Sequence, residues 1–257
     1  MEIKNNYTQN KEENKDTRLS LTPFYDDNGK MIDGLKQGIK SDGKKYTVRD
    51  YRNRYFFPDE WNEFFNLLNK DKNFIFEVLI MTGARIEEAL CIKVSNIRWD
   101  RNYLTLFITK VKAKKGETKP TPRDISLSSS FMRKLKKYIS DNKLKEGDYL
   151  FLDNSKEYLT REDLKKETRK HKVAISQMMK RALKKTKIKD WYNFSLHNIR
   201  KTHGMWLKAL DVKFEEICKR LGHDANTYLK HYGSSDIFDR RDRQMMIKTL
   251  GDIYGIQ

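Results

Sequence analysis

The sequence predicts a mainly α-helical fold with a small antiparallel β-hairpin or sheet, which is an α+β architecture. Apolar residues recur at helical spacing through most of the chain after residue 54. Two short segments rich in β-branched and aromatic residues stand within this helical pattern. The length of 257 residues and the 37% share of hydrophobic residues allow a sizeable core without metal or disulfide support.

Residues 1–53 read as a polar arm that we expect to be loosely ordered. Asn, Lys, Asp, Glu and Gly predominate there, and apolar residues are too sparse to show a helical or a strand period. Such a segment cannot bury enough surface to offset the entropy of ordering it. The arm could wrap a nucleic acid, and a solvated leader without specific contacts fits the composition equally well.

The first two helices are predicted from dense apolar residues. One begins near Pro58, because Trp61 and its successors up to Leu68 recur at i, i+3, i+4 and i+7. The segment FIFEVLIM (74–81) reads as a buried helix that ends at Gly83. A further helix is expected from Arg85, which places its guanidinium beside backbone N–H groups that can bind an anion.

A hairpin is predicted next. Residues 103–109 (YLTLFIT) read as a strand, and a partner strand is expected at 123–127 (RDISL). Between them lies the basic tip KVKAKKGETKPTP (110–122), which is either a solvated loop or a candidate to enter a nucleic-acid groove. Further helices are expected after the capping residues SLSSS (126–130) and over about 163–184, with YLF (149–151) as a short strand or buried turn.

The last third carries the candidate chemistry. His197 and Arg200 lie one helical turn apart in SLHNIRKTHGMW. An amphipathic helix over 214–221 is expected to end at Gly222, and the stretch from His223 to Tyr232 follows it. After Tyr232 we expect a loop and a final helix, which could pack in cis or reach a neighbouring protomer.

The charge of the chain points to a polyanionic partner. The 54 Lys and Arg residues exceed the 36 Asp and Glu residues by 18, and nucleic acid is the commonest partner of such a protein. An acidic membrane surface is disfavoured, because no basic amphipathic anchor, secretory signal or membrane span is visible. Cys91 and Cys218 read as buried thiols of a reduced, intracellular protein.

Three segments, in this order, resemble the conserved boxes of the tyrosine recombinase (phage integrase) family: MTGARIEEAL (81–90), SLHNIRKTHG (195–204) and LGHDANTYLKHYG (221–233). The resemblance covers roughly residues 54–252. It implies the catalytic-domain fold of that family for residues 54–257, with a C-terminal helix after the nucleophile. The space before Phe57 is too short and too polar for the helical core-binding domain that most members carry.

The resemblance also implies roles for individual residues. Arg85 and Arg200 would grip the scissile phosphate, because a guanidinium stays charged and its forked donors match phosphate oxygens. His197 would help deprotonate the nucleophile or bind the phosphate, and His223 would bind the phosphate from the other side. Tyr232 would be the nucleophile.

Supporting roles follow from the same comparison. Glu88 would orient neighbouring residues of the site, or it is a simple carboxylate on the helix surface. The family's general acid is a hairpin lysine, for which Lys110 is favoured and Lys112 comes second. The basic tip would contact DNA through four lysines: Lys112, Lys114, Lys115 and Lys119.

Residues that compete for these roles are read differently. Tyr228 lies one turn before Tyr232 and is the nearby rival for the nucleophile. His203 is expected to be a satisfied packing residue, and His171 is expected to be solvated on a lysine-rich face. His231 matches no catalytic position of the family.

The activity implied is site-specific recombination or integration through a 3′-phosphotyrosyl intermediate, without metal, ATP or another cofactor. The partner would be double-stranded DNA, bound by a homotetramer formed through the C-terminal helix. We expect a cytoplasmic, nucleoid-associated protein of a prokaryotic or viral system, with no membrane contact. The alternatives are DNA relaxation in the manner of a type IB topoisomerase and a catalytically inactive DNA-binding derivative of the fold.

Overall fold

The computed structural model describes residues 22–25, 28–29, 31–39, 45–49, 54–70, 72–107, 122–158, 160–232, 237–251 and 253. The chain divides into two compact units, Met1–Arg52 and Asn53–Gln257. The first unit contains an antiparallel sheet in the order β1-β2-β3, formed by β1 (Thr22–Tyr25), β2 (Met31–Ile39) and β3 (Lys45–Arg49).

These strands were not predicted, because residues 1–53 show neither a helical nor a strand period in their apolar residues. Tyr25, Met31 and Ile39 are all more than half exposed, so the sheet includes apolar side chains that it does not bury. Backbone pairing in full register joins β2 to β3, from Leu35 opposite Arg49 to Ile39 opposite Lys45. Pairing through backbone hydrogen bonds does not require alternating apolar side chains. The sequence of these strands therefore shows no period from which they could be predicted.

Apart from α8 (Ala225–Tyr232), which the sequence indicates only as a stretch after Gly222, the described helices of the second unit lie where the sequence predicts helices. In chain order they are α1 (Pro58–Asn66), α2 (Phe74–Thr82), α3 (Ile86–Leu90), α4 (Ser129–Asp141), α5 (Arg161–Leu183), α6 (Leu196–Ala209), α7 (Phe214–Leu221), α8 (Ala225–Tyr232) and α9 (Arg240–Leu250), with 3-10 turns η3 (Val94–Asn96) and η4 (Trp191–Asn193). Gly83 ends α2 and Gly222 ends α7, both in the left-handed conformation predicted for them, with φ of 62° and 59°.

The predicted hairpin is confirmed as part of a second antiparallel sheet, in the order β4-β5-β6. Its strands are β4 (Ile97–Arg98), β5 (Tyr103–Leu106) and β6 (Arg123–Ser126), with Leu104 opposite Ile125. The short β4 was not predicted, because two residues carry no readable period. At 149–151, where a short strand or a buried turn is expected, Tyr149 forms an isolated antiparallel bridge to Lys93.

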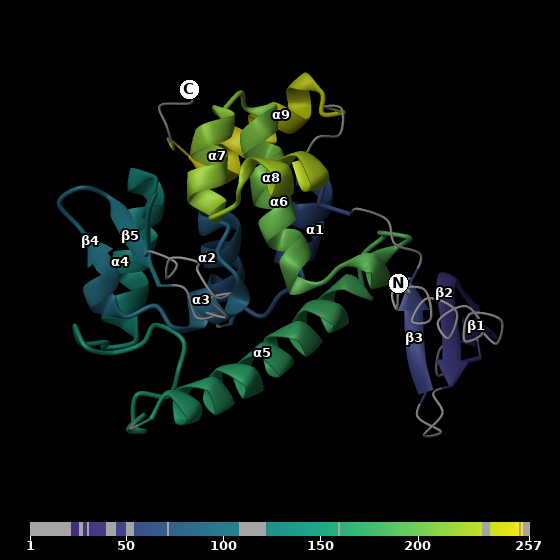
Figure 1. Ribbon diagram of the computed structural model, residues 1–257, viewed down its shortest axis with the longest axis horizontal. Coiled ribbons are helices and arrows are strands. Elements are labelled where there is room, and N and C mark those ends of the chain that lie inside the picture. Colours follow the sequence, from purple (N-terminus) through teal and green to yellow (C-terminus); the bar gives the residue numbers. More distant parts are fainter. Residues whose placement is uncertain are drawn as a thin grey trace, which may run out of the picture. The chain divides into compact units, whose positions relative to one another are not determined.

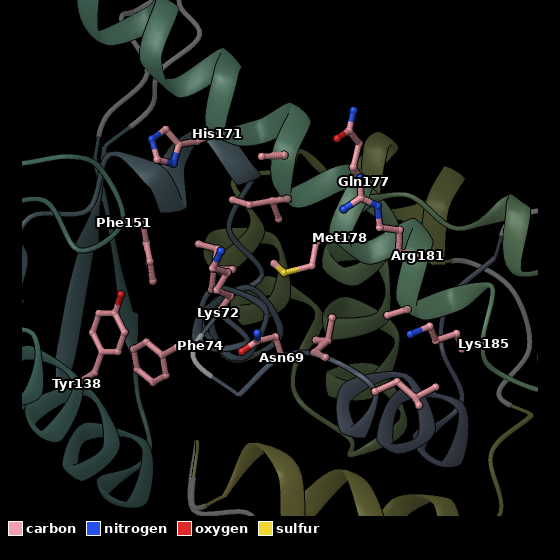
Figure 2. Close-up of a pocket in the computed structure, with 16 residues that line it drawn as sticks. Asn69, Lys72, Phe74, Tyr138, Phe151, His171, Gln177, Met178, Arg181 and Lys185 are labelled. Atoms are coloured by element: carbon pink, nitrogen blue, oxygen red, sulfur yellow. The ribbon is translucent and has the colours of Figure 1, made fainter.

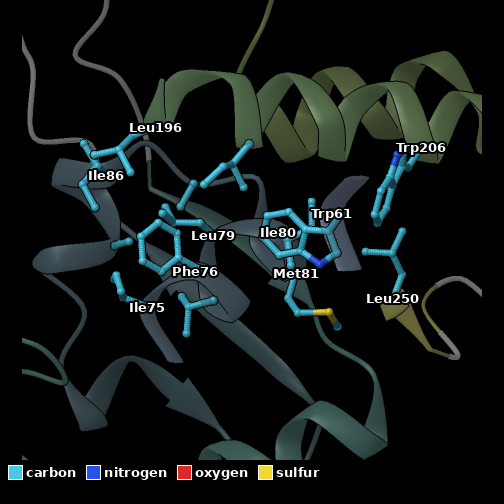
Figure 3. Packing of buried hydrophobic residues seen from close by; sticks show 14 of the residues in the cluster. Trp61, Ile75, Phe76, Leu79, Ile80, Met81, Ile86, Leu196, Trp206 and Leu250 are labelled. Atoms are coloured by element: carbon cyan, nitrogen blue, oxygen red, sulfur yellow. The ribbon is translucent and has the colours of Figure 1, made fainter. Parts of the chain in front are cut away.

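Helix α6 organises the core of the second unit. It packs against α2, α7, α8 and α9 (Figure 1). Figure 3 shows the side chains of α2, among them Ile80, lying beneath α6 between Leu196 at one end and Trp206 at the other. Trp206 is fully buried and its Nε1 donates to the carbonyl of Phe56, 3.0 Å away. The same helix therefore carries both core packing and the HNIR motif.

The last helix packs in cis. Met246 and Leu250 of α9 are buried, and α9 contacts α1 and α6. The Arg243 guanidinium donates to the carbonyl of Ala209 at the end of α6 (2.5 Å). Of the two arrangements left open by the sequence, the single chain thus adopts the intramolecular one.

The second unit also contains a cavity that lies apart from the residues with predicted catalytic roles. The cavity of about 710 Å³ opens between α5 and the start of α2, lined by Phe74, Tyr138, Phe151 and Met178, with His171 at its edge (Figure 2). Cys218 is buried as predicted, whereas Cys91 is only partly buried. In the described parts of the chain, every helix is too short or too polar to cross a membrane.

Candidate active site

The start of α3 brings Arg85 and Glu88 together. Arg85 precedes the helix, and its backbone N–H donates to Glu88 Oε2 at 2.8 Å. Its guanidinium Nη1 lies 2.8 Å from Glu88 Oε1. The Arg85 side chain remains 34% exposed, whereas that of Glu88 is 1% exposed. Glu88 therefore holds one side of the Arg85 guanidinium, while the exposed part of the side chain can contact a ligand.

Glu88 is also bound by Arg123, the first residue of β6. The Arg123 fork spans both carboxylate oxygens, with Nη2 at 2.5 Å from Oε2 and Nη1 at 3.3 Å from Oε1. Burial alone would raise the pKa of the Glu88 carboxyl, but hydrogen bonds and charges from Arg123 and Arg85 lower it below its ordinary value. Glu88 is thus a buried anion that joins two arginines, which supports the orienting role over that of a surface carboxylate.

Arg200 completes what we call the arginine cluster: Arg85, Glu88, Arg123 and Arg200. It is 1% exposed, and Nη1 donates to the carbonyl of Gly83 at 2.7 Å and lies 3.9 Å from Glu88 Oε2. Its Nη2 donates to the carbonyl of Leu221 and lies 3.0 Å from His223 Nε2. Burial, together with the charge of Arg85, lowers the pKa of Arg200 to about 9, so the guanidinium stays charged at neutral pH.

Another buried arginine, Arg220, contacts the cluster through its carbonyl, which accepts from Arg123 Nε. Arg220 donates to His203 Nε2 at 2.8 Å, to the carbonyl of Met81 at 2.6 Å and to the carbonyl of Ser126 at 2.8 Å. His203 Nδ1 lies 2.6 Å from the carbonyl of Ile80, and burial lowers the pKa of His203 well below its usual value. These contacts confirm His203 as a satisfied packing residue, neutral at physiological pH.

Tyr232 ends α8 and is 1% exposed. Its ring lies 5.9 Å from the ring of His223 and 5.2 Å from that of Tyr228, centroid to centroid. Gly204 of α6 provides the space for it, because a Cβ there would approach Tyr232 Cε1 to 2.6 Å and Leu221 Cδ1 to 2.9 Å. The nucleophile predicted from the sequence is therefore seated on the one glycine of α6.

The electrostatic environment separates Tyr232 from its rival. Burial raises the pKa of Tyr232 to about 12, while the charges of Arg200 and Arg85 oppose this rise. Burial also raises the pKa of Tyr228, which lies against Phe214 at 4.9 Å between ring centroids. The charges of Arg200 and Arg85 lower the pKa of Tyr232, whereas the charge named for Tyr228, that of Cys218, raises its pKa.

A lysine of α6 holds the backbone of the tyrosine. Lys208 Nζ donates to the carbonyl of Tyr232 at 2.7 Å. This carbonyl belongs to the last residue of α8, where helix carbonyls lack partners within the helix and a cation is favoured. The position of Tyr232 and the hydrogen bond to its carbonyl thus both depend on α6.

The remaining predicted residues are placed as follows. His197 is exposed in the first turn of α6, three residues before Arg200. His171, expected to be solvated, is partly exposed and its Nε2 lies 3.2 Å from Glu167 Oε1. The five hairpin lysines fall outside the described residues, as does the side chain of His231; the lysines are Lys110, Lys112, Lys114, Lys115 and Lys119.

The family of the chain is identified by its match to a known family model. The model of the phage integrase family matches residues 54–237, which is most of the chain. The chain belongs to the phage integrase family. The match starts at Arg54 and ends after Tyr232, so it includes every described residue of the arginine cluster and α8. The resemblance inferred from the three sequence boxes is thereby confirmed.

Solved structures show the same fold as this integrase-family chain. A crystal structure of XerA recombinase has a TM-score of 0.52 at 18% identity, covering 78% of this chain and 65% of that one. The Tn1549 transposon integrase in complex with circular intermediate DNA gives 0.52 at 16% identity, covering 77% and 66%. A variant of that integrase with transposon right end DNA gives 0.54 at 15% identity, covering 82% and 69%. The matched region spans about two thirds of those chains. No curated protein matches the sequence.

Sequence reasoning missed several residues of this integrase-family site. Arg123 lies two residues before Ile125, so both side chains are on the same buried face of β6, and this spacing indicates a buried charge. Arg220 lies three residues after the buried Ile217, on the apolar side of α7. Gly204 had no readable signal, because its need for a missing Cβ arises from the ring of a residue that is distant in sequence.

Proposed function

We propose that this protein is a site-specific DNA recombinase or integrase that cuts and rejoins strands through Tyr232. The proposal rests mainly on one observation: Arg85 and Arg200, from distant parts of the chain, both contact Glu88. The charges of these two arginines also lower the pKa of Tyr232. Family membership supports the reaction class, and the net charge of +18 supports a duplex DNA substrate.

In the proposed cleavage step, the Tyr232 phenolate attacks the scissile phosphorus. A phosphotyrosyl ester forms at the 3′ end, the bond from phosphorus to the 5′ oxygen breaks, and that oxygen leaves as a hydroxyl after taking up a proton. Religation is the reverse reaction, so the energy of one phosphodiester is kept in the intermediate. The reaction then needs neither ATP nor a metal, because the arginines supply the positive charge.

The arginine cluster would stabilise the pentavalent phosphorane. Arg85 is exposed enough to contact a non-bridging oxygen, and Arg200 is held rigidly by two backbone carbonyls. Donors fixed in advance need no reorganisation when charge develops, which is the main source of such stabilisation. His223, 3.0 Å from Arg200, would complete the phosphate contacts, and His197 would contact the phosphate or receive the phenol proton.

Proton donation to the leaving oxygen is assigned to Lys110, with Lys112 as the second choice. Lys110 follows directly on the predicted first strand of the hairpin, so it would be better positioned than a lysine at the tip. The other tip lysines, Lys114, Lys115 and Lys119, would bind DNA backbone phosphates.

Assembly on paired DNA sites as a homotetramer is part of the proposal. The exchanged element would be α9, which would have to leave its cis contacts with α1 and α6, where Met246 and Leu250 are buried. With duplex DNA as substrate, the protein would act in the cytoplasm of a prokaryote or of a host cell of a prokaryotic virus.

The test is covalent capture of DNA. A library of nicked duplexes with a randomised central segment is incubated with the protein, and the DNA bound after denaturation is sequenced. We expect wild type to select a defined duplex and to form a denaturation-resistant adduct with it. Tyr232→Phe should form none, and the matched control Tyr228→Phe should keep it.

Three outcomes would contradict parts of this proposal. An adduct formed by Tyr232→Phe and lost in Tyr228→Phe would move the nucleophile. Tight duplex binding by wild type without any adduct would favour an inactive DNA-binding derivative. Relaxation of a supercoiled plasmid that lacks the selected site would favour a topoisomerase.

A further inference from the structure

We infer that Arg123 is a positioning residue for the phosphate-binding arginines and acts on them through Glu88. This inference rests on the proposed function. Arg123 lies at the start of β6, 38 positions after Arg85 in the chain, and its fork takes both oxygens of the carboxylate that anchors Arg85.

The geometry fixes the carboxylate in one orientation. Arg123 Nη1 and Nη2 bind the two Glu88 oxygens, and Arg123 Nε donates to the carbonyl of Arg220 at 2.9 Å. The Arg123 side chain is 8% exposed, so solvent does not compete for these bonds. A planar fork that is itself tied to the end of α7 holds the Glu88 carboxylate against rotation.

Orientation of Glu88 sets the position of Arg85. Arg85 Nη1 is bound to Glu88 Oε1, the same oxygen that accepts from Arg123 Nη1. A turn of this carboxylate about its last bond would carry the Arg85 guanidinium with it. Since a misplacement of about 1 Å can reduce a rate by about 10²-fold, Arg123 would affect the chemistry although Glu88 and Arg85 separate it from the phosphate.

Charge balance gives Arg123 a second effect. Glu88 carries one negative charge, and Arg85, Arg123 and Arg200 all lie within 4.0 Å of it. Arg123 has the shortest contact and is the most fully paired, so it neutralises the carboxylate. With Arg123 the arginine cluster carries a net charge of about +2 toward a phosphate, whereas Arg85, Arg200 and Glu88 alone would carry about +1.

The experiment compares wild type with Arg123→Lys on the duplex that wild type selects by covalent capture. A lysine keeps the charge but cannot hold both Glu88 oxygens and the Arg220 carbonyl together. We expect the single-turnover cleavage rate to fall about 10²-fold while the Kd for the duplex changes less than about twofold, since the contact with DNA is not made by Arg123. The matched control is Arg54→Lys, which alters an arginine bound to Glu60 and Asp190 and should cleave like wild type.

Two modified substrates identify the route of the effect. In a methylphosphonate duplex the scissile group is uncharged, so the arginines stabilise less charge and the ratio of wild-type to Arg123→Lys rates should shrink below about tenfold. In a 5′-phosphorothiolate duplex the leaving group needs no acid, and the ratio should stay unchanged, because Arg123 does not act on the hairpin acid. An unchanged ratio with methylphosphonate, or a rescue with phosphorothiolate, would overturn the inference.

A purely structural role is tested by neutralising the pair. If Arg123 served only to balance a buried charge, the double variant Glu88→Gln/Arg123→Gln would recover wild-type cleavage. We expect it to fold, by its circular dichroism and melting transition, and to remain slow. Wild-type cleavage by Arg123→Lys would overturn the inference and leave the proposed function standing, whereas failure of wild type to cleave any duplex would overturn both.

Discussion

The two halves of the candidate site are held by different forces. The arginine cluster is fixed by directional bonds: Glu88 accepts from Arg85 and Arg123, and Arg200 donates to two backbone carbonyls. Helix α8, in contrast, places Tyr232 by the fit of its ring against Gly204 and by the neighbouring rings of His223 and Tyr228.

This difference suits the two tasks of a strand-cutting enzyme. A charge-stabilising group works best when its donors are aligned before the charge appears, so bonds that resist rotation are an advantage. A nucleophile must move toward the phosphate and later carry it, and apolar packing is less directional than hydrogen bonding. Substitutions in each half of the site can show whether directional bonds and ring packing contribute separately to the cleavage rate.

The largest effect is expected from the rigid half, in Arg200→Lys. The ammonium of lysine cannot serve the carbonyls of Gly83 and Leu221 and a phosphate at the same time. Single-turnover adduct formation should fall on the order of 10³-fold, with duplex affinity reduced far less. The control is Lys219→Arg on the exposed side of α7, which should react at the wild-type rate. If the rate of adduct formation fell less than about tenfold, the positive charge alone, and not the forked guanidinium, would be needed at this position.

A smaller effect is expected when the packed half is disturbed by Gly204→Ala. The new Cβ would stand 2.6 Å from Tyr232 Cε1, so the ring must leave its present seat. We expect adduct formation to fall about 10²-fold, while the melting temperature changes by only a few degrees, because alanine favours the helix by about 1 kcal/mol. Gly147→Ala, where a Cβ meets nothing within 4 Å, is the matched control. Normal cleavage by Gly204→Ala would show that Tyr232 does not react from this seat.

The smallest effect concerns the proton of Tyr232. Its pKa of about 12 in the folded chain lies above the value of about 10 for free tyrosine. The folded state therefore holds this proton more tightly, and the resulting stability is complete below pH 10 and is lost as the pH rises through 12. We expect the free energy of unfolding to drop by about 2–3 kcal/mol more in wild type than in Tyr232→Phe over that range. Parallel behaviour between about pH 6 and 9 serves as the internal control, and equal alkaline slopes would contradict the prediction.

The sequence was sufficient for whatever depends on local periodicity. The helices that carry Trp61, Ile80 and Trp206 follow from apolar spacing, and the residues brought together as Arg85, Arg200 and Tyr232 were singled out in advance. The roles of these three residues stay predictions until the covalent capture is done. Periodicity is a property of one segment, which is why it located the elements so well.

Features that depend on two segments at once were not readable. Arg123 becomes part of the site only because β6, antiparallel to β5, begins beside Glu88 of α3, and Gly204 matters only because α8 returns to α6. The sheet of residues 22–49 was missed for a related reason, since its strands are held by pairing with each other while Met31 and Ile39 remain exposed. Long-range pairing leaves no period in a single strand.

The hydrogen bond from Lys208 to the carbonyl of Tyr232 has a mechanical consequence. It holds the backbone rather than the phenol, so esterification of the phenol would not break it. Tension from an attached DNA strand would pass from the tyrosine ring to its Cα, and then through this carbonyl into α6, a largely buried helix of the unit. A cleaved DNA strand attached to Tyr232 would thus be held through Lys208 by α6, and not only by the end of the short helix α8.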